Sequence, residues 1–250
     1  MPHAVYPSLA NKVVVVTGGG SGIGADIVAG FVRQKSRVFF LDVAEDCSRE
    51  LVDQLSGAAQ FHHCDLTDID ALKAAVAEIE AKAGPAAVLV NNAANDDRHS
   101  AHDVTPAYWD NRMNVNLRHI FFASQRVAAG MKRGGGGSII NLGSVSWHLG
   151  LPDLSLYETA KAAIEGMTRA MARDLGEDNI RVNCVIPGAV RTPRQMALWH
   201  TPEEEAKILA QQCIKARVDP IDVAAMVLFL GSDDSRLCTG HNYWVDAGYC

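Results

Sequence analysis

The chain has 250 residues, of which 48% are hydrophobic and 21% are charged, an ordinary composition for a globular domain. Its formal net charge of −6 offers no basic surface of the kind that nucleic-acid-binding proteins carry. No apolar run reaches the ~20 residues of a membrane span, and the first residues lack the basic and apolar parts of a secretion signal. We therefore expect a cytoplasmic protein with no nucleic-acid and no membrane partner.

The cysteines show neither a CxxC pair nor close pairing with histidine. Such spacing is not typical of zinc sites, and unpaired thiols are typical of proteins from reducing compartments. The sequence therefore predicts reduced cysteines and no metal site. The six cysteines are Cys47, Cys64, Cys184, Cys213, Cys238 and Cys250.

Predicted strands and helices alternate along the chain without a linker. Apolar and β-branched runs predict strands at 13–17, 37–42, 59–64, 87–91, 138–143, 180–186 and 242–245. Helical periodicity predicts helices over 23–34, 46–56, 68–83, 105–130, 154–176 and 219–230. Alternation of this kind is typical of right-handed βαβ crossovers. We expect an α/β protein with a doubly wound parallel sheet of about seven strands and helices on both faces.

Two segments depart from this alternation. The four glycines 134–137 predict a flexible connector and not a phosphate loop, because a strand follows them where a phosphate loop would be followed by a helix. Segment 191–216 contains Pro193, Pro202 and a run of glutamates. We expect this segment to fold over the functional site as a lid.

A glycine-rich stretch, Thr17–Gly24, directly follows the first predicted strand and precedes a helix. Glycines let a phosphate approach the backbone N–H groups, and the helix start adds a positive dipole end. Asp42 ends the second strand, at the offset of about 20 residues that is typical of a carboxylate binding an adenosine ribose. That carboxylate would repel a 2′-phosphate, so the sequence favours NAD over NADP. The alternative is that Asp42 only caps the next helix.

Tyr157 and Lys161 are four residues apart, so they share one face of the helix predicted at 154–176. An ammonium close to a phenol favours the phenolate and lowers the pKa of Tyr157. Ser144, thirteen positions upstream, lies on the loop after a predicted strand and can reach the same point. A Tyr-x-x-x-Lys pair alone is usually only a helix surface. Because this pair follows a nucleotide-binding half and is accompanied by Ser144, it predicts a proton-transfer centre.

With these motifs the chain resembles the short-chain dehydrogenase/reductase family over nearly its whole length. The residues that carry the resemblance are Thr17-Gly18-x-x-x-Gly22-Ile23-Gly24, Asn91-Asn92-Ala93-Ala94, Asn116, Tyr157-x-x-x-Lys161, Pro187-Gly188, Thr239-Gly240 and Val245-Asp246-Ala247-Gly248. Ala94 departs from the family pattern, which has glycine there, and narrows the loop slightly. The resemblance implies a single Rossmann-fold domain over 1–250, with a dinucleotide-binding half at 12–143 and a catalytic and substrate half at 144–250.

The resemblance also implies the roles of individual residues. Tyr157, as a phenolate, would remove the substrate hydroxyl proton while hydride passes to the nicotinamide. Lys161 would lower the pKa of Tyr157 and hold the cofactor ribose. The catalytic residues would be Asn116, Ser144, Tyr157 and Lys161. The NAD-binding residues would be Gly18, Ser21, Gly22, Ile23, Gly24, Asp42, Asp65, Leu66 (the last two ending the third strand), Asn92, Ala93, Tyr157, Lys161, Pro187, Gly188, Val190 and Thr192.

Polar segments near the expected site resemble more specifically those of bacterial NAD-dependent sugar 1-dehydrogenases. They are Asn91–His99, Ser146–Leu151, Leu156–Lys161 and Leu237–His241. A polyol needs many hydrogen-bonding groups, so the polar loop 95–99 suits a sugar better than a steroid or a fatty acyl chain. The implied reaction is oxidation of the C1 hydroxyl of a cyclic aldose, of the D-xylose or L-arabinose type, to the aldonolactone. Predicted substrate contacts are Asn95, Asp96, Ser144, Trp147, His148 and Tyr157.

Other interpretations stay open at this point. The run Asp96-Asp97-Arg98 could be a surface turn with its own ion pair, Trp147 could be plain packing, and His148 could be a loop residue. The protein could instead be a carbonyl reductase of the 3-oxoacyl type, or a redox sensor that binds NAD without turnover. By analogy with the family, a homotetramer would form through the helices at 105–130 and 154–176.

Overall fold

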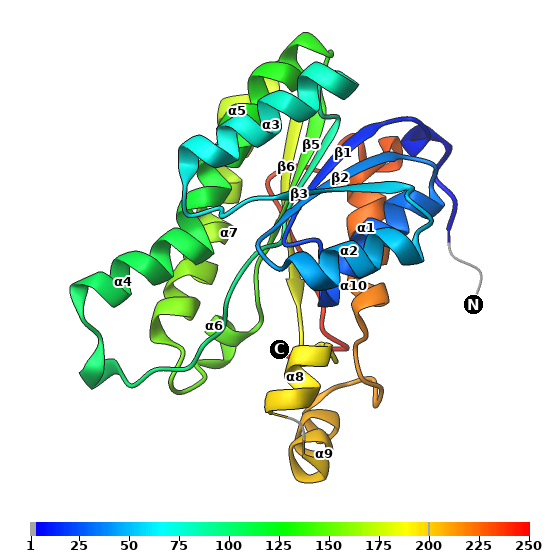
Figure 1. Ribbon diagram of the computed structural model, residues 1–250. Helices are drawn as coiled ribbons and strands as arrows, with labels where there is room; N and C mark the ends of the chain where they lie inside the picture. The colour runs from blue at the N-terminus through cyan, green and yellow to red at the C-terminus, as the bar shows by residue number, and fades with distance from the viewer. Residues whose placement is uncertain (1–3, 200) are drawn as a thin grey trace.

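The computed structural model describes residues 4–199 and 201–250. The predicted strands are β1 (Val13–Thr17), β2 (Arg37–Asp42), β3 (Ala59–His63), β4 (Val88–Asn91), β5 (Gly137–Leu142), β6 (Ile180–Pro187) and β7 (Asn242–Val245). All pair in parallel, in the order β3-β2-β1-β4-β5-β6-β7 (Figure 1). The predicted seven-stranded parallel sheet is therefore confirmed. The order reverses between β1 and β4, which is where doubly wound sheets open a crevice for a ligand.

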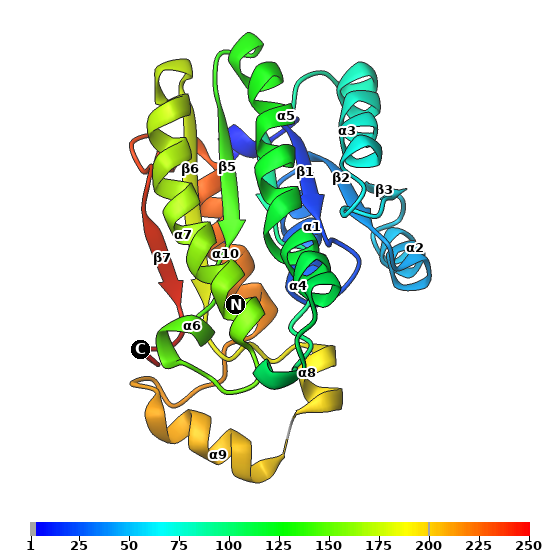
Figure 2. The same cartoon turned by 90° about the vertical axis from the view of Figure 1, so that its left-hand side faces the viewer.

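Helices cover both faces of this sheet (Figures 1 and 2). One face carries α1 (Gly22–Arg33), α2 (Glu45–Gln54) and α10 (Pro220–Gly231). The other face carries α3 (Ile69–Ala83), α5 (His119–Arg133) and α7 (Ser155–Leu175). Single helical turns are Pro7–Leu9, Ala101–Asp103, Gly176–Asp178 and Asp233–Ser235. Within the described ranges, none of the helices combines the length and the apolarity that a membrane crossing needs.

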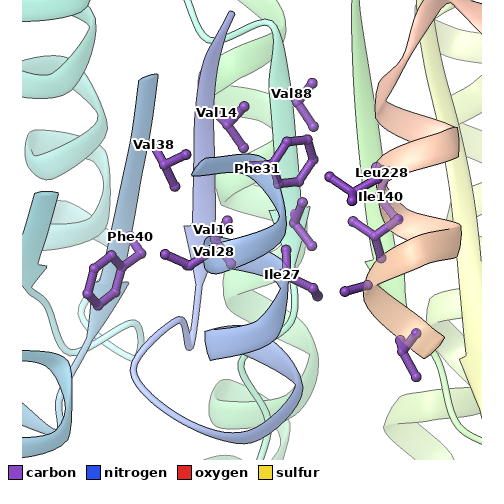
Figure 3. Close-up of a cluster of buried hydrophobic side chains, with 14 of the residues drawn as sticks. Val14, Val16, Ile27, Val28, Phe31, Val38, Phe40, Val88, Ile140 and Leu228 are labelled. Carbon is purple, nitrogen blue, oxygen red and sulfur yellow. The ribbon is translucent and has the colours of Figure 1, made fainter. Parts of the chain in front are cut away.

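The first strand shows how the core is built. Val14 and Val16 pack against α1 and α10 in the cluster drawn in Figure 3, while Val13 and Val15 belong to the core on the other face. Successive strand residues point to opposite faces, so a run of valines fills both cores. Phe31 of α1 is fully buried in the first cluster.

The helix predicted over 105–130 is interrupted. It consists of α4 (Pro106–Met113), a π-helical turn (Asn114–Arg118) and α5. The Thr105 side chain accepts the N–H of Tyr108 (3.2 Å) and so fixes the start of α4. The prediction of one regular helix is therefore wrong, because the π turn inserts a residue in its middle.

The four glycines after α5 form the turn into β5. Gly136 has φ +137°, and a Cβ atom there would lie 2.6 Å from the backbone oxygen of Asn179. The backbone therefore requires glycine at this position. The predicted connector is present, and its last residue already belongs to β5.

Three short helices lie beyond the carboxyl ends of the strands. They are α6 (Ser146–Leu149), α8 (Pro193–Leu198) and α9 (Pro202–Gln211) (Figure 1). The threonines at positions 192 and 201 cap α8 and α9, and the following prolines occupy the first helical positions. Segment 191–216 thus forms a helical cover at the edge of the sheet where the crevice is expected.

Candidate active site

A cavity of about 740 Å³ runs along the carboxyl ends of the strands and under α8 and α9. Every residue predicted to bind the cofactor lines it, from Gly18 at the glycine turn to Thr192 at the start of α8. A volume of this size is typical of ligand pockets. Of the predicted catalytic and substrate-binding residues, five line the cavity: Asn95, Asp96, Ser144, Tyr157 and Lys161. Asn116, Trp147 and His148 are not among its lining residues.

The glycine turn after β1 has the shape of an anion cradle. Gly22 has φ +54°, and a Cβ atom on Gly24 would lie 1.9 Å from the backbone oxygen of Gly18. Ser21 precedes α1 and makes no side-chain capping bond, so its side chain satisfies no N–H of the first turn. Those N–H groups and the helix dipole suit the diphosphate of a dinucleotide.

Asn92 fastens this turn to the neighbouring strand. Its amide nitrogen donates to the backbone oxygens of Gly18 (2.7 Å) and Thr17 (3.2 Å). The hydroxyl of Thr17 in turn accepts the N–H groups of Asn92 (3.1 Å) and Ala93 (3.2 Å). Asn92 therefore holds the cradle in shape, and Asn92 and Ala93 form part of its wall.

Asp42 lies at the rim of the cavity, at the end of β2. Its carboxylate accepts the N–H groups of Gly20 (2.8 Å) and Ala44 (3.0 Å). Ala44, and not Asp42, occupies the N-cap position of α2. A carboxylate with spare lone pairs thus remains beside the glycine turn, where a ribose hydroxyl could donate to it. Asp65 and Leu66 also line the cavity, although β3 ends at His63, one residue earlier than predicted.

Tyr157 and Lys161 project from the first two turns of α7 toward the loop that follows β5. The ammonium of Lys161 donates to the backbone oxygen of Leu142 (2.7 Å) and lies 5.4 Å from the centre of the Tyr157 ring. On the facing loop, the hydroxyl of Ser144 accepts the N–H of Ser146 (3.1 Å) and lies 2.9 Å from its hydroxyl. The expected serine, tyrosine and lysine therefore meet in one buried corner of the cavity.

The electrostatics of this corner correct one expectation. Burial raises the pKa of Tyr157 well above its ordinary value, the negative charge of Asp96 raises it further, and the hydrogen bond with Ser144 lowers it in part. Burial lowers the pKa of Lys161 to about 8, against smaller opposing effects from Cys184 and Asp96. The expected net lowering of the Tyr157 pKa is therefore absent in the protein alone, because loss of solvent dominates.

Asn116 lies behind the cavity, in the π-helical turn, and is fully buried. Its side-chain oxygen accepts the N–H of Asn95 (2.7 Å), which ties the turn to the polar loop. Its side-chain nitrogen has no partner among the described residues. A buried amide donor without a partner suits an ordered water, which is the role that the family resemblance implies.

Trp147 and His148 are directed to a neighbouring cluster. The indole N–H of Trp147 donates to Glu165 Oε1 (2.6 Å), and His148 Nε2 lies 3.0 Å from the same oxygen. The His148 ring contacts the rings of Trp147 (3.7 Å between ring centres) and Trp244 (4.4 Å), both at tilted angles. Because neither side chain lines the cavity, the geometry favours packing over their predicted contact with substrate.

Residues of α8 that the sequence did not single out complete the cavity. Arg194, Gln195 and Trp199 line it, and Arg194 forms ion pairs with Asp96 and Asp97 of the polar loop. The alternative of a turn with its own ion pair is therefore wrong, since both aspartates pair with α8. A separation of almost a hundred residues hides this pairing from any local sequence pattern.

Potential metal ligands do not cluster in the part of the chain that is described. No group of three or more histidine, cysteine or acidic side chains there is arranged to hold a metal ion. All six cysteines are free.

Comparison with known proteins identifies the family. A family model of enoyl-(acyl carrier protein) reductases matches residues 18–250. The chain is 61% identical to D-xylose 1-dehydrogenase of Caulobacter vibrioides, covering 100% of both chains, and 44% identical to a probable galactose dehydrogenase of Rhizobium meliloti, covering 99% and 98%. The fold matches a short-chain type dehydrogenase/reductase from Mycobacterium ulcerans with a TM-score of 0.92 at 27% identity, covering 97% and 90%.

A second solved structure bears on the cofactor. It is a blue fluorescent protein from a metagenomic library in complex with NADPH, with a TM-score of 0.89 at 34% identity, covering 97% of this chain and 99% of that one. The chain therefore belongs to the short-chain dehydrogenase/reductase family, whose members bind a nicotinamide cofactor.

Proposed function

We propose that this protein oxidises the C1 hydroxyl of a cyclic aldose, of the D-xylose or L-arabinose type, to the aldonolactone with NAD. The observation that carries the proposal is the meeting of Ser144, Tyr157 and the polar loop residues Asn95 and Asp96 in one cavity beside the glycine cradle. The full-length similarity to a D-xylose 1-dehydrogenase supports the same substrate class. The C1 carbon of a cyclic aldose carries both a hydroxyl and a hydrogen, and its oxidation removes the hydroxyl proton and transfers that hydrogen as hydride.

In the proposed mechanism the side chains act on one oxygen. Ser144 donates a hydrogen bond to the C1 oxygen of the sugar, and Tyr157 accepts the proton of that hydroxyl. As the proton leaves, the O–H electrons form the C1=O bond of the lactone and the C1 hydrogen departs as hydride. NAD, when bound, supplies the acceptor of that hydride and a cationic ring that favours the phenolate. Lys161 holds the cofactor ribose, and Asn116 orients a water that carries the proton onward.

The raised pKa of Tyr157 sets an expectation for the pH dependence. A tyrosine that resists ionisation gives few phenolate groups at neutral pH, although each is a strong base. We therefore expect the rate of oxidation to rise from neutral to alkaline pH.

Asp42 supports the choice of NAD. Its carboxylate faces the cavity next to the glycine turn, where the 2′-phosphate of NADP would meet a negative charge. No basic side chain stands at Ser21, at the start of α1.

We further propose a single domain with the cofactor half at 12–143 and the catalytic half at 144–250, assembled as a cytoplasmic homotetramer. The assembly would use α4, α5 and α7, and large exposed rings on α4 and α5 support it: Trp109 is 44% exposed and Phe121 is 43% exposed. Light scattering after size exclusion measures the mass. The cytoplasmic location rests on the sequence alone.

A substrate panel tests the proposal. The purified protein is incubated with NAD or NADP and with D-xylose, L-arabinose, D-glucose or D-galactose, and NADH or NADPH is followed by absorbance. The reverse panel offers a 3-oxoacyl thioester or a ketosteroid with the reduced cofactor. NADH formation with an aldose is expected. Turnover of the thioester or steroid alone would favour the carbonyl reductase, and NAD binding without turnover of any compound would favour the redox sensor.

A further inference from the structure

The carboxylate of Asp96 is held at both oxygens by α8. Oδ1 accepts a hydrogen bond from Arg194 Nε (3.1 Å), and Oδ2 accepts one from Gln195 Nε2 (2.7 Å). Arg194 also donates to Asp97 (2.6 Å), whose other oxygen accepts from Arg112 of α4 (3.3 Å). The position of the Asp96 carboxylate is thus fixed from the lid side.

The same loop contacts the far end of α8. The guanidinium of Arg98 stacks on the ring of Trp199 at 4.6 Å and donates to the backbone oxygen of Pro152 (3.2 Å). The loop therefore meets α8 at two separate points, and Asp96, Arg194, Gln195 and Trp199 all line the cavity.

The position of this ion pair matters more than its strength. Arg194 is about half exposed, and ion pairs of that kind add little to folding stability. Asp96, however, is close enough to Tyr157 for its charge to act on the phenol. A residue that orients and partly neutralises Asp96 therefore acts on the reacting end of the cavity.

We propose that Arg194 and Gln195 are positioning residues for the substrate, which hold Asp96 so that its free lone pairs accept two neighbouring hydroxyls of the sugar ring. This inference rests on the proposed function. An ionised carboxylate has about four acceptor sites. Arg194 and Gln195 use one on each oxygen, so each oxygen keeps one for a sugar hydroxyl. A pair of adjacent hydroxyl donors, as on an aldose ring, matches these two acceptors.

The first test compares kinetic constants of variants with the aldose that the wild-type protein oxidises. Arg194→Ala is expected to raise the KM for the sugar about tenfold, the loss that follows from about 1.4 kcal/mol of weakened hydrogen bonding. On the alkaline plateau of the pH profile, kcat is expected to change less than twofold, and so is the Kd for NAD. Arg194→Lys is expected to restore part of the affinity, because lysine keeps the positive charge but lacks the paired N–H donors of the guanidinium.

Lys207→Ala is the matched control. It removes the ion pair between Lys207 and Glu204 on α9, in the same cover, without touching the polar loop. Its kinetic constants are expected to equal those of the wild type. Thermal unfolding shows whether Arg194→Ala folds normally. If it does not, Gln195→Ala is used in its place, and the same rise in the KM for the sugar is expected.

The pH profile separates positioning from a purely structural role. The charged and polar groups that face the phenol of Tyr157 are Asp96 of the loop, Lys161 of α7 and Ser144, and Arg194 faces Asp96 and Asp97. Without Arg194, the negative charge of Asp96 is less neutralised, so the phenolate is disfavoured. The rising limb of kcat/KM then moves to higher pH. Asp96→Asn moves it to lower pH, and adding Arg194→Ala to Asp96→Asn gives little further shift.

The outcomes distinguish failure of the positioning role from failure of the proposed function. Suppose that the wild type oxidises an aldose, that the KM of Arg194→Ala stays within twofold of that of Lys207→Ala, and that the rising limb of its pH profile does not move. The positioning role is then refuted, and the proposed function stands. If the wild type oxidises no aldose, both are refuted. A raised KM with an unmoved pH profile would mean that Arg194 acts only in closing the lid, which also refutes the proposed role.

Discussion

Replacing Gly24 with alanine tests whether the glycine cradle has the shape that the structure gives it. The added Cβ would lie 1.9 Å from the backbone oxygen of Gly18 and 2.7 Å from the amide nitrogen of Asn92. Contacts of real Cβ atoms are essentially never below 3.0 Å, so the turn must retreat by about 1 Å. Overpacking of this kind costs about 1–3 kcal/mol. For a chain of this length, that lowers Tm by about 2–12 °C.

The same shift opens the hydrogen bond between Asn92 and Gly18, so NAD affinity is expected to fall at least as steeply as stability. Thermal unfolding and calorimetric titration with NAD measure the two effects. Gly176→Ala is the control, because Gly176 has helical torsions (φ −63°, ψ −35°) and open space around it. That variant is expected to gain about 0.4–1 kcal/mol with unchanged NAD binding. Equal Tm and equal NAD affinity for Gly24→Ala and the wild type would refute the reasoning.

Three further predictions concern single side chains. Tyr157→Phe is expected to lower kcat at least a hundredfold with NAD affinity nearly intact, and retention of a tenth of the wild-type kcat would contradict its role as base. Asp42→Ala is expected to reduce the ratio of kcat/KM for NAD over NADP; an unchanged ratio would locate the selectivity elsewhere. Burial and the charge of Lys161 lower the pKa of His119 to about 4 in the folded protein, against 6.5 for a free histidine. Protonation therefore favours unfolding, and stability falls by up to about 3 kcal/mol as pH drops from about 6.5 to about 4. Urea unfolding across that range is expected to show a smaller loss in His119→Gln.

The parts of the site that local patterns encode were predictable. The glycine spacing, the Tyr157–Lys161 pair and the carboxylate at Asp42 each follow from residues close together in sequence, and the cavity contains all of them. The parallel sheet followed from alternating periodicities, and strand ends were off by at most one residue where hydrogen bonding, and not residue type, decides the end.

The remaining features depend on contacts between distant segments. The pairing of Arg194 with Asp96 joins α8 to the polar loop, and no repeat or spacing in the sequence connects the two. The turn of Trp147 away from the cavity depends on Glu165 of α7, which offers a buried acceptor to the indole. The raised pKa of Tyr157 reflects how much the fold desolvates the phenol, a quantity that the four-residue spacing to Lys161 does not contain.

The π-helical turn also sets the angular phase between α4 and α5. Trp109 and Phe121 are twelve residues apart, and at about 100° per residue an unbroken α-helix would point them about 120° away from each other. One extra residue in the winding reduces that angle to about 20°. By this geometry, a single inserted residue would place the two half-exposed residues on nearly the same side of the rod formed by α4 and α5. Deleting one residue from the turn would rotate the rings apart while leaving the hydrophobic composition of both helices untouched.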